Sequence, residues 1–216
     1  MKWFYAAAVF ACAYSNGSAE TVTEAAIALY TARHYPEAEA VLEKIVAADP
    51  QNAAACYYLG MALRHRNTDH ALGDAVVWLE KAVALARDNA AYVADYGETC
   101  FLIADQERSP LFATRGRDAL KTAIALNPGL LGARASLMEF YARAPWPLGG
   151  SSAALAQAVE ISQRDSARGL CAYLRLAEIF EKKDDRRAGR TACQGALKLD
   201  PNNATAAAAL ARLSAP

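Results

Sequence analysis

The chain is poor in the residues and motifs from which most catalytic and metal sites are built. It has three histidines in 216 residues, and no serine stands in the sequence context of a nucleophile elbow. No strand pattern is present, and no glycine-rich phosphate loop. His65, Asp69, His70 and Asp74 lie close together, but their spacing matches no established metal-binding signature, so a polar turn is the simpler interpretation. We therefore expect a protein that is not an enzyme and that needs neither cofactor nor metal.

An excess of charge of either sign is also missing. Lys and Arg number 23, and Asp and Glu also number 23, so the formal net charge is zero. Proteins that bind nucleic acid or anionic lipid through their charge carry a basic surface. We therefore expect no nucleic-acid partner.

No apolar run is long enough to cross a bilayer, which takes about 20 residues. The apolar run at residues 3–14 follows Lys2 and precedes the small residues of the Asn-Gly-Ser-Ala sequence at 16–19. This order is typical of a signal peptide that is cleaved after Ala19. We expect residues 1–19 to be removed and the mature protein to be periplasmic or secreted, without an integral membrane segment.

Two other interpretations of this leader remain open. The apolar run could be the first helix of the fold. It could also be a lipoprotein signal in which Cys12 carries the lipid, although Phe10 is bulkier than the usual pattern allows.

Residues 170–203 (LCAYLRLAEIFEKKDDRRAGRTACQGALKLDPNN) contain two helical patterns joined by a charged turn. The stretch is 34 residues long, which is the period of helix–turn–helix repeats that stack into a solenoid. Apolar residues recur at helical spacing in both halves, and Pro201 separates the second helix from the next one. This unit resembles the tetratricopeptide repeat, and the resemblance extends over nearly the whole chain.

The resemblance implies an all-α fold, a right-handed α-solenoid of about five repeats with a C-terminal capping helix. We expect this solenoid domain to span residues 20–216. The repeats are expected at 20–52, 53–89, 90–130, 131–169 and 170–203, and the capping helix at 204–213.

The cysteines that follow the leader are Cys56, Cys100, Cys171 and Cys193. Export and an even number permit disulfides. However, all but Cys171 fall at core-facing positions of different helices. Cys171 and Cys193 would be offset by roughly 9 Å along antiparallel helices, beyond disulfide reach. We expect buried, unpaired thiols.

Three repeats carry insertions at the turn between their paired helices. Seven extra residues in the third repeat add about one turn to each helix, and Ser109-Pro110 is typical of a helix start. The insertion at 144–150 holds two prolines and two glycines, which exclude helix. Insertions that share one edge of a solenoid often bind partners. Trp146 is the strongest candidate on this loop edge, unless it packs over the hairpin ends.

The resemblance also implies that the first helix of each pair lines a concave groove. The residues expected there are Tyr30, Tyr57, Met61, Arg64, Glu98, Phe101, Glu139 and Arg143, with Glu178 and Lys182 at the charged end. Such a groove suits a segment with apolar anchors. The clamp of polar residues that grips a terminal carboxylate in this family is not expected, because Tyr57 and Met61 occupy the second repeat's groove. Alternatively, Tyr30, Tyr57 and Phe101 pack between helices.

We therefore predict a non-catalytic, exported scaffold or adaptor that binds a protein or peptide through the groove, the loop edge or both. The alternative is an accessory protein that holds a small apolar ligand beneath the long helical hairpins. The sequence does not identify the partner.

Overall fold

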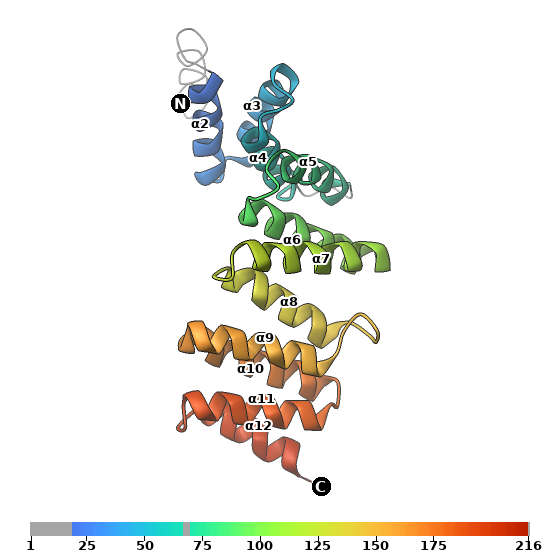
Figure 1. Ribbon diagram of the computed structural model, residues 1–216, viewed down its shortest axis with the longest axis vertical. Helices are drawn as coiled ribbons and strands as arrows, with labels where there is room; N and C mark the ends of the chain where they lie inside the picture. The colour runs from blue at the N-terminus through green and yellow to red at the C-terminus, as the bar shows by residue number, and fades with distance from the viewer. Residues whose placement is uncertain (1–18, 67–69, 216) are drawn as a thin grey trace. The chain divides into compact units, whose positions relative to one another are not determined.

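A computed structural model describes residues 19–66 and 70–215. The leader before Ala19, with Cys12, and Asp69 of the polar turn lie outside these residues. Over the described ranges the chain forms eleven α-helices and no strand, as the sequence predicts. The chain divides into two compact units, residues 1–116 and 117–216. Within each unit, helices that follow one another in the chain lie beside one another (Figure 1).

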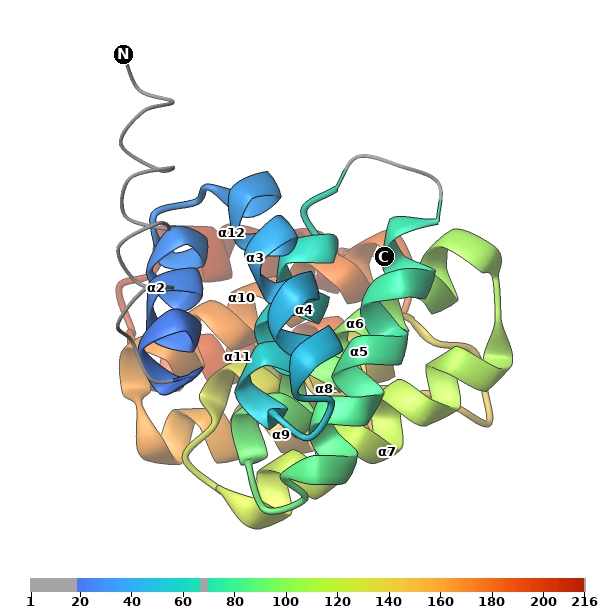
Figure 2. The same ribbon diagram turned by 90° about the horizontal axis from the view of Figure 1, so that it is seen from above.

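The described residues of unit 1 form five complete helices, each packed on the next in chain order, and the first part of a sixth. They are α2 (Ala19–Thr31), α3 (Tyr35–Ala48), α4 (Ala53–Leu63), α5 (Ala71–Leu85), α6 (Ala90–Glu107) and the first part of α7 (Pro110–Leu126). Its core includes the fully buried side chains of Leu42, Leu59 and Leu79. Figures 1 and 2 both show α4 and α5 side by side.

The close approach of α4 and α5 depends on Gly60. A Cβ atom at this position would lie 2.8 Å from Cγ of Leu79 and 3.0 Å from the carbonyl oxygen of Ala75. Both distances are too short for a carbon contact, so a side chain at position 60 would push the helices apart.

Asparagine begins the first helix of several pairs. Asn52 accepts a hydrogen bond from the Ala55 amide at 2.9 Å, and Asn203 accepts one from the Ala206 amide at 3.0 Å. Asn89 caps α6 in the same way. The last residue of these repeats is therefore the N-cap of the following helix, which is why the repeat ending is visible in the sequence.

The third repeat has the longest hairpin, as its extra residues predict. α6 has 18 residues and α7 has 17. Arg108 turns the chain between them with a φ of 55°, in the left-handed region. α7 begins at Pro110, where proline needs no hydrogen-bond partner for its nitrogen.

Unit 2 contains the rest of α7 and five further helices. They are α8 (Leu131–Arg143), α9 (Ser151–Arg164), α10 (Ser166–Lys182), α11 (Arg186–Leu199) and α12 (Ala204–Ser214). Its core includes Leu137, Met138, Ile161, Leu176 and Phe180.

The first helix of the fifth repeat starts earlier than the sequence pattern indicates. α10 begins at Ser166, four residues before Leu170, because Asp165 caps it by accepting a hydrogen bond from the Arg168 amide at 2.9 Å. The expected fourth repeat therefore includes the first residues of α10. Asp165 is the N-cap here, the role that asparagine has at the ends of several other repeats.

The four described cysteines are free. Cys56, Cys100 and Cys193 are buried at core positions, as predicted, whereas Cys171 is exposed. In the described part of the chain, every helix is too short or too polar to span a bilayer.

Candidate functional site

Unit 1 contains a chain of ring-to-ring contacts that we call the tyrosine cluster. Its members come from α2, α3, α4 and α6 and from the turn after α4. They are Tyr30, Tyr35, Tyr57, Tyr58, Tyr92 and His65.

The rings meet in stacked, edge-on and tilted geometries. Tyr57 stacks on Tyr92, with centroids 4.1 Å apart, and meets Tyr58 edge-on at 5.0 Å. Tyr58 meets Tyr30 edge-on at 5.3 Å. Offset-stacked and edge-to-face pairs are the favoured arrangements of aromatic rings, so the contacts stabilise the packing of these helices on one another.

At the other end of the cluster, Tyr35 stacks on His65 with ring centroids 3.8 Å apart. Burial, followed by the nearby charges of Arg64 and Arg33, lowers the pKa of His65 below its ordinary value. The imidazole is therefore neutral at pH 7, which suits its place against an aromatic ring.

A charged edge borders the tyrosine cluster. The Tyr57 hydroxyl donates a hydrogen bond of 2.6 Å to Oδ2 of Asp95, and Nη1 of Arg64 lies 3.9 Å from Oδ1 of the same carboxylate. Arg64 also contacts the sulfur of Met61 at 3.5 Å. Burial, and then the hydrogen bond to Asp95, raise the pKa of Tyr57 well above its usual range, so the hydroxyl remains a donor at physiological pH.

The structure brings together most of the groove residues predicted for unit 1. Tyr30 and Tyr57 are half-buried members of the tyrosine cluster, and Met61 and Arg64 lie at its charged edge. Phe101 lies elsewhere, because a Cβ atom on Gly116 would be 2.5 Å from its ring. Its ring therefore packs between α6 and α7, the alternative left open by the sequence.

Tyr35, Tyr58, Tyr92 and Asp95 were missed from the predicted set. A signal for two of them exists, because Tyr92, Asp95 and the half-buried Glu98 recur every three residues along one face of α6. The stack of Tyr35 on His65 has no such signal, because Tyr35 begins α3 and His65 lies in the turn after α4.

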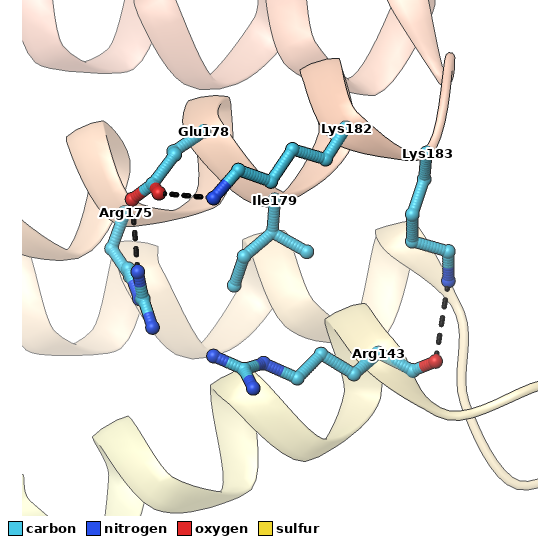
Figure 3. A pocket seen from close by; sticks show the side chains of 6 residues that line it. All are labelled: Arg143, Arg175, Glu178, Ile179, Lys182 and Lys183. Carbon is cyan, nitrogen blue, oxygen red and sulfur yellow. Dashed lines mark hydrogen bonds and ion pairs between the residues drawn. The ribbon is translucent and has the colours of Figure 1, made fainter.

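Unit 2 has an open pocket of about 390 Å3 at α8 and α10, which we call the charged pocket (Figure 3). Its lining residues are Arg143, Arg175, Glu178, Ile179, Lys182 and Lys183.

Two carboxylates order the cations of the charged pocket. Glu139 accepts hydrogen bonds from Arg143 at 2.8 Å and from Arg175 at 3.0 Å. Glu178 accepts from Arg175 at 2.8 Å and from Lys182 at 2.7 Å. The hydrogen bonds from Lys182 and Arg175 lower the pKa of Glu178. The hydrogen bond to Glu139, followed by the one to Glu178, raises the pKa of Arg175. Glu178 and Arg175 are therefore charged at neutral pH.

Lys183 joins the two helices at one end of the charged pocket. Its Nζ donates to the carbonyl oxygens of Ala142 at 2.8 Å and Arg143 at 3.4 Å, at the end of α8 (Figure 3). Carbonyls at a helix C-terminus have no intrahelical partner and favour a cation. The sequence placed Glu139, Arg143, Glu178 and Lys182 in the groove but missed Arg175 and Lys183.

The loop edge begins where α8 ends. Hydrogen bonds from Leu148 to the Pro145 carbonyl, 3.0 Å, and from Gly150 to the Tyr141 carbonyl, 2.9 Å, close the loop on itself and on α8. Trp146 is 88% exposed, so it does not pack over the hairpin ends. Its role in binding remains a prediction.

Within the described ranges, no three His, Cys, Asp or Glu side chains are placed to hold a metal ion.

Comparisons with known proteins point to one family. Residues 172–203 match the tetratricopeptide-repeat family, and a comparison with curated proteins gave no match.

Solved structures match over most of the chain. YrrB, described as a TPR protein with an unusual peptide-binding site, is 19% identical, with 93% of this chain and 96% of that chain covered and a TM-score of 0.68. MamA is 22% identical, with 86% and 93% covered and a TM-score of 0.68. TTC0263, a thermophilic TPR protein of Thermus thermophilus, is 18% identical, with 91% and 98% covered and a TM-score of 0.58.

Residues 172–203 are thus a tetratricopeptide repeat in sequence, and the chain has the helical-repeat fold of the tetratricopeptide-repeat proteins.

Proposed function

We propose that the protein is a non-catalytic, exported scaffold that binds a protein or peptide segment through the first helices of its repeats. The tetratricopeptide-repeat fold is typical of protein–protein interaction modules, and YrrB, with a similar fold, has a peptide-binding site. The observation that carries the proposal is the tyrosine cluster with its charged edge.

The tyrosine cluster has the chemistry of a binding surface. Tyrosine has few rotatable bonds and offers both apolar area and a hydroxyl, so it contributes contact area at a low entropic cost. Ring contacts hold these side chains before a partner arrives. Met61, Arg64 and Asp95 add one adaptable apolar side chain and two charges beside the rings.

Selection from a random peptide library tests the proposal. Peptides selected on the full chain are measured against a variant that carries Met61→Lys and Arg64→Gln, at the charged edge. We expect the variant to bind them at least about tenfold more weakly, the loss typical of a residue at the energetic centre of an interface.

The matched control carries Val77→Lys and Arg87→Gln, which make the same kinds of change at exposed positions of α5 and the turn after it. It should bind the selected peptides like the original protein. Equal losses in both variants, or a failure to select any binding peptide, would contradict the proposal.

Export is the second part of the proposal, and the order of charged, apolar and small residues before Glu20 supports it. Intact-mass measurement of protein from a bacterial envelope fraction should give a chain that begins at Glu20. A chain that retains residues 1–19 would overturn export by cleavage. A lipid adduct on Cys12 would support anchoring instead.

The alternative, a small apolar ligand, has less support. The pocket in unit 2 is lined by five charged side chains and Ile179, which disfavours an apolar molecule. Native mass spectrometry of freshly purified protein checks this, because a bound small molecule would add a fixed mass.

A further inference from the structure

The zero net charge of the chain conceals an unequal division of charge between the two units. Residues 117–216 contain fourteen Lys and Arg against nine Asp and Glu, a net charge of +5. Residues 1–116 contain nine against fourteen, a net charge of −5. A body of net positive charge attracts acidic partners and repels basic ones, so unit 2 differs from unit 1 in the partner it favours.

The charged pocket concentrates this positive charge. Arg143, Arg175, Lys182 and Lys183 supply four cations. Glu139 and Glu178 are the two carboxylates that bind the first three, whereas Lys183 binds backbone carbonyls. The local balance is therefore +2, and an added carboxylate would improve the electrostatics of the site.

Arg143 and Lys182 are the cations best placed to meet a ligand. Their side chains are 57% and 72% exposed, against 39% for Arg175. Each makes one described hydrogen bond to a carboxylate one turn away in its own helix. A guanidinium has five N–H donors and an ammonium has three, so both retain donors for a further carboxylate.

The pocket also has an apolar floor. Figure 3 shows Ile179 among the side chains of Arg143, Arg175 and Lys182, and its own side chain is 7% exposed. A ligand that fits this pattern carries negative charge beside an apolar group. A free inorganic anion would use the cations but not the floor.

The exposed Trp146 belongs to the loop that begins beside the pocket. Lys183 binds the carbonyl of Arg143, three residues before Trp146, so the end of the pocket is also the start of the loop. The loop's internal hydrogen bonds hold it closed. An exposed aromatic on an ordered loop is a suitable anchor for a partner.

We propose that the charged pocket binds an acidic segment of a partner protein, with carboxylates on Arg143 and Lys182 and an apolar side chain over Ile179. The inference rests on the proposed binding function and deepens it by naming the class of partner. Incoming carboxylates share donors with Glu139 and Glu178. Exposed ion pairs of this kind are individually weak and readily exchanged.

The test measures fluorescence anisotropy of labelled short peptides with the full chain. The probe alternates glutamate and leucine, and its counterparts replace glutamate by lysine or leucine by serine. We expect the acidic, apolar peptide to bind more tightly than both counterparts, and the binding to weaken as salt screens the charges.

Paired variants locate the binding. Arg143→Gln with Lys182→Gln should weaken it by about tenfold. Arg164→Gln with Lys198→Gln is the control, because it removes the same charge from unit 2, and Arg164 makes an equivalent pair with Glu160 one turn away, at 2.6 Å. The control should change binding less than twofold.

Several outcomes would overturn the inference. One is an equal loss of binding in the two variants. Another is that the acidic peptide does not bind, or binds less tightly than the lysine peptide. A third is that phosphatidylserine vesicles or single-stranded DNA bind more tightly than the acidic peptide. If the acidic peptide fails while library peptides still bind at the tyrosine cluster, the inference about the pocket is wrong and the proposed function stands. If both fail, the proposed function is wrong as well.

Discussion

The Tyr57 hydroxyl lies 2.6 Å from Oδ2 of Asp95 and donates a hydrogen bond to it. Tyr57 belongs to α4 and Asp95 to α6, the first helices of consecutive pairs, and 38 positions separate the two residues. The bond therefore joins two repeats at the surface where a partner is proposed to bind.

Removing this hydroxyl should weaken unit 1 slightly without unfolding it. Tyr57→Phe keeps the ring contacts and loses one hydrogen bond to a partly exposed carboxylate, so we expect a fall of about 1 kcal/mol in the free energy of unfolding. Urea unfolding followed by circular dichroism measures it. Tyr58→Phe is the control, because the described contacts of Tyr58 are those of its ring with other rings and with the apolar core. An equal fall in both variants would show that the hydrogen bond does not contribute.

Two glycine substitutions should change the stability of the fold in opposite directions. Gly60→Ala places a methyl group against Leu79 and the Ala75 carbonyl, so we expect a loss of about 1–3 kcal/mol in spite of alanine's better helix propensity. Gly132→Ala meets nothing within 4 Å and should stabilise α8 by up to about 1 kcal/mol. The midpoint temperatures of thermal unfolding of the two variants, compared with the original protein, check both expectations. A stable Gly60→Ala variant would mean that α4 and α5 do not pack this closely.

Thiol reactivity should separate the four described cysteines. Burial raises the pKa of Cys56, Cys193 and Cys100, to about 11 for Cys100, whereas Cys171 is exposed. The thiolate is the reactive form, so iodoacetamide at neutral pH should label Cys171 first and the others only after unfolding. Peptide mapping by mass spectrometry identifies the labelled residue. Rapid labelling of Cys100 in the native chain would contradict its buried position.

Alkaline pH should unfold the protein and ionise its half-buried tyrosines together. Burial is the first cause of the raised pKa of Tyr57 and of Tyr96, so the fold favours their neutral forms. The stability that they contribute is complete below the unfolded pKa of about 10 and is lost as pH rises toward the folded values.

Absorbance of tyrosinate, followed with circular dichroism, checks this expectation. We expect a steep rise in absorbance that coincides with loss of helix, with a smaller amplitude in Tyr57→Phe. Complete ionisation of the tyrosines near pH 10 (about the ordinary value) with the helices intact would show that these hydroxyls are not buried.

The sequence alone determined that the chain is helical and where several helices begin, because the signals for them are local. Asn52 and Asn203 end their repeats and cap the helices that follow, and Pro110 begins α7. The groove residues were predicted by placing the sequence on the repeat pattern of the family, and their role in binding stays a prediction. Those that the structure brings together in unit 1 are Tyr30, Tyr57, Met61 and Arg64. Local spacing fixes which face of a helix a residue occupies, and it does so before any packing takes place.

Only the tertiary structure decided which of these faces meet. The stack of Tyr35 on His65, the contact of Arg175 with Glu139 across 36 positions, and the bond from Lys183 to the end of α8 all join separate helices. Each depends on how closely two helices approach and on the rotamers that packing permits. Helical periodicity carries no information about either, which is why the charged pocket emerged from the folded chain.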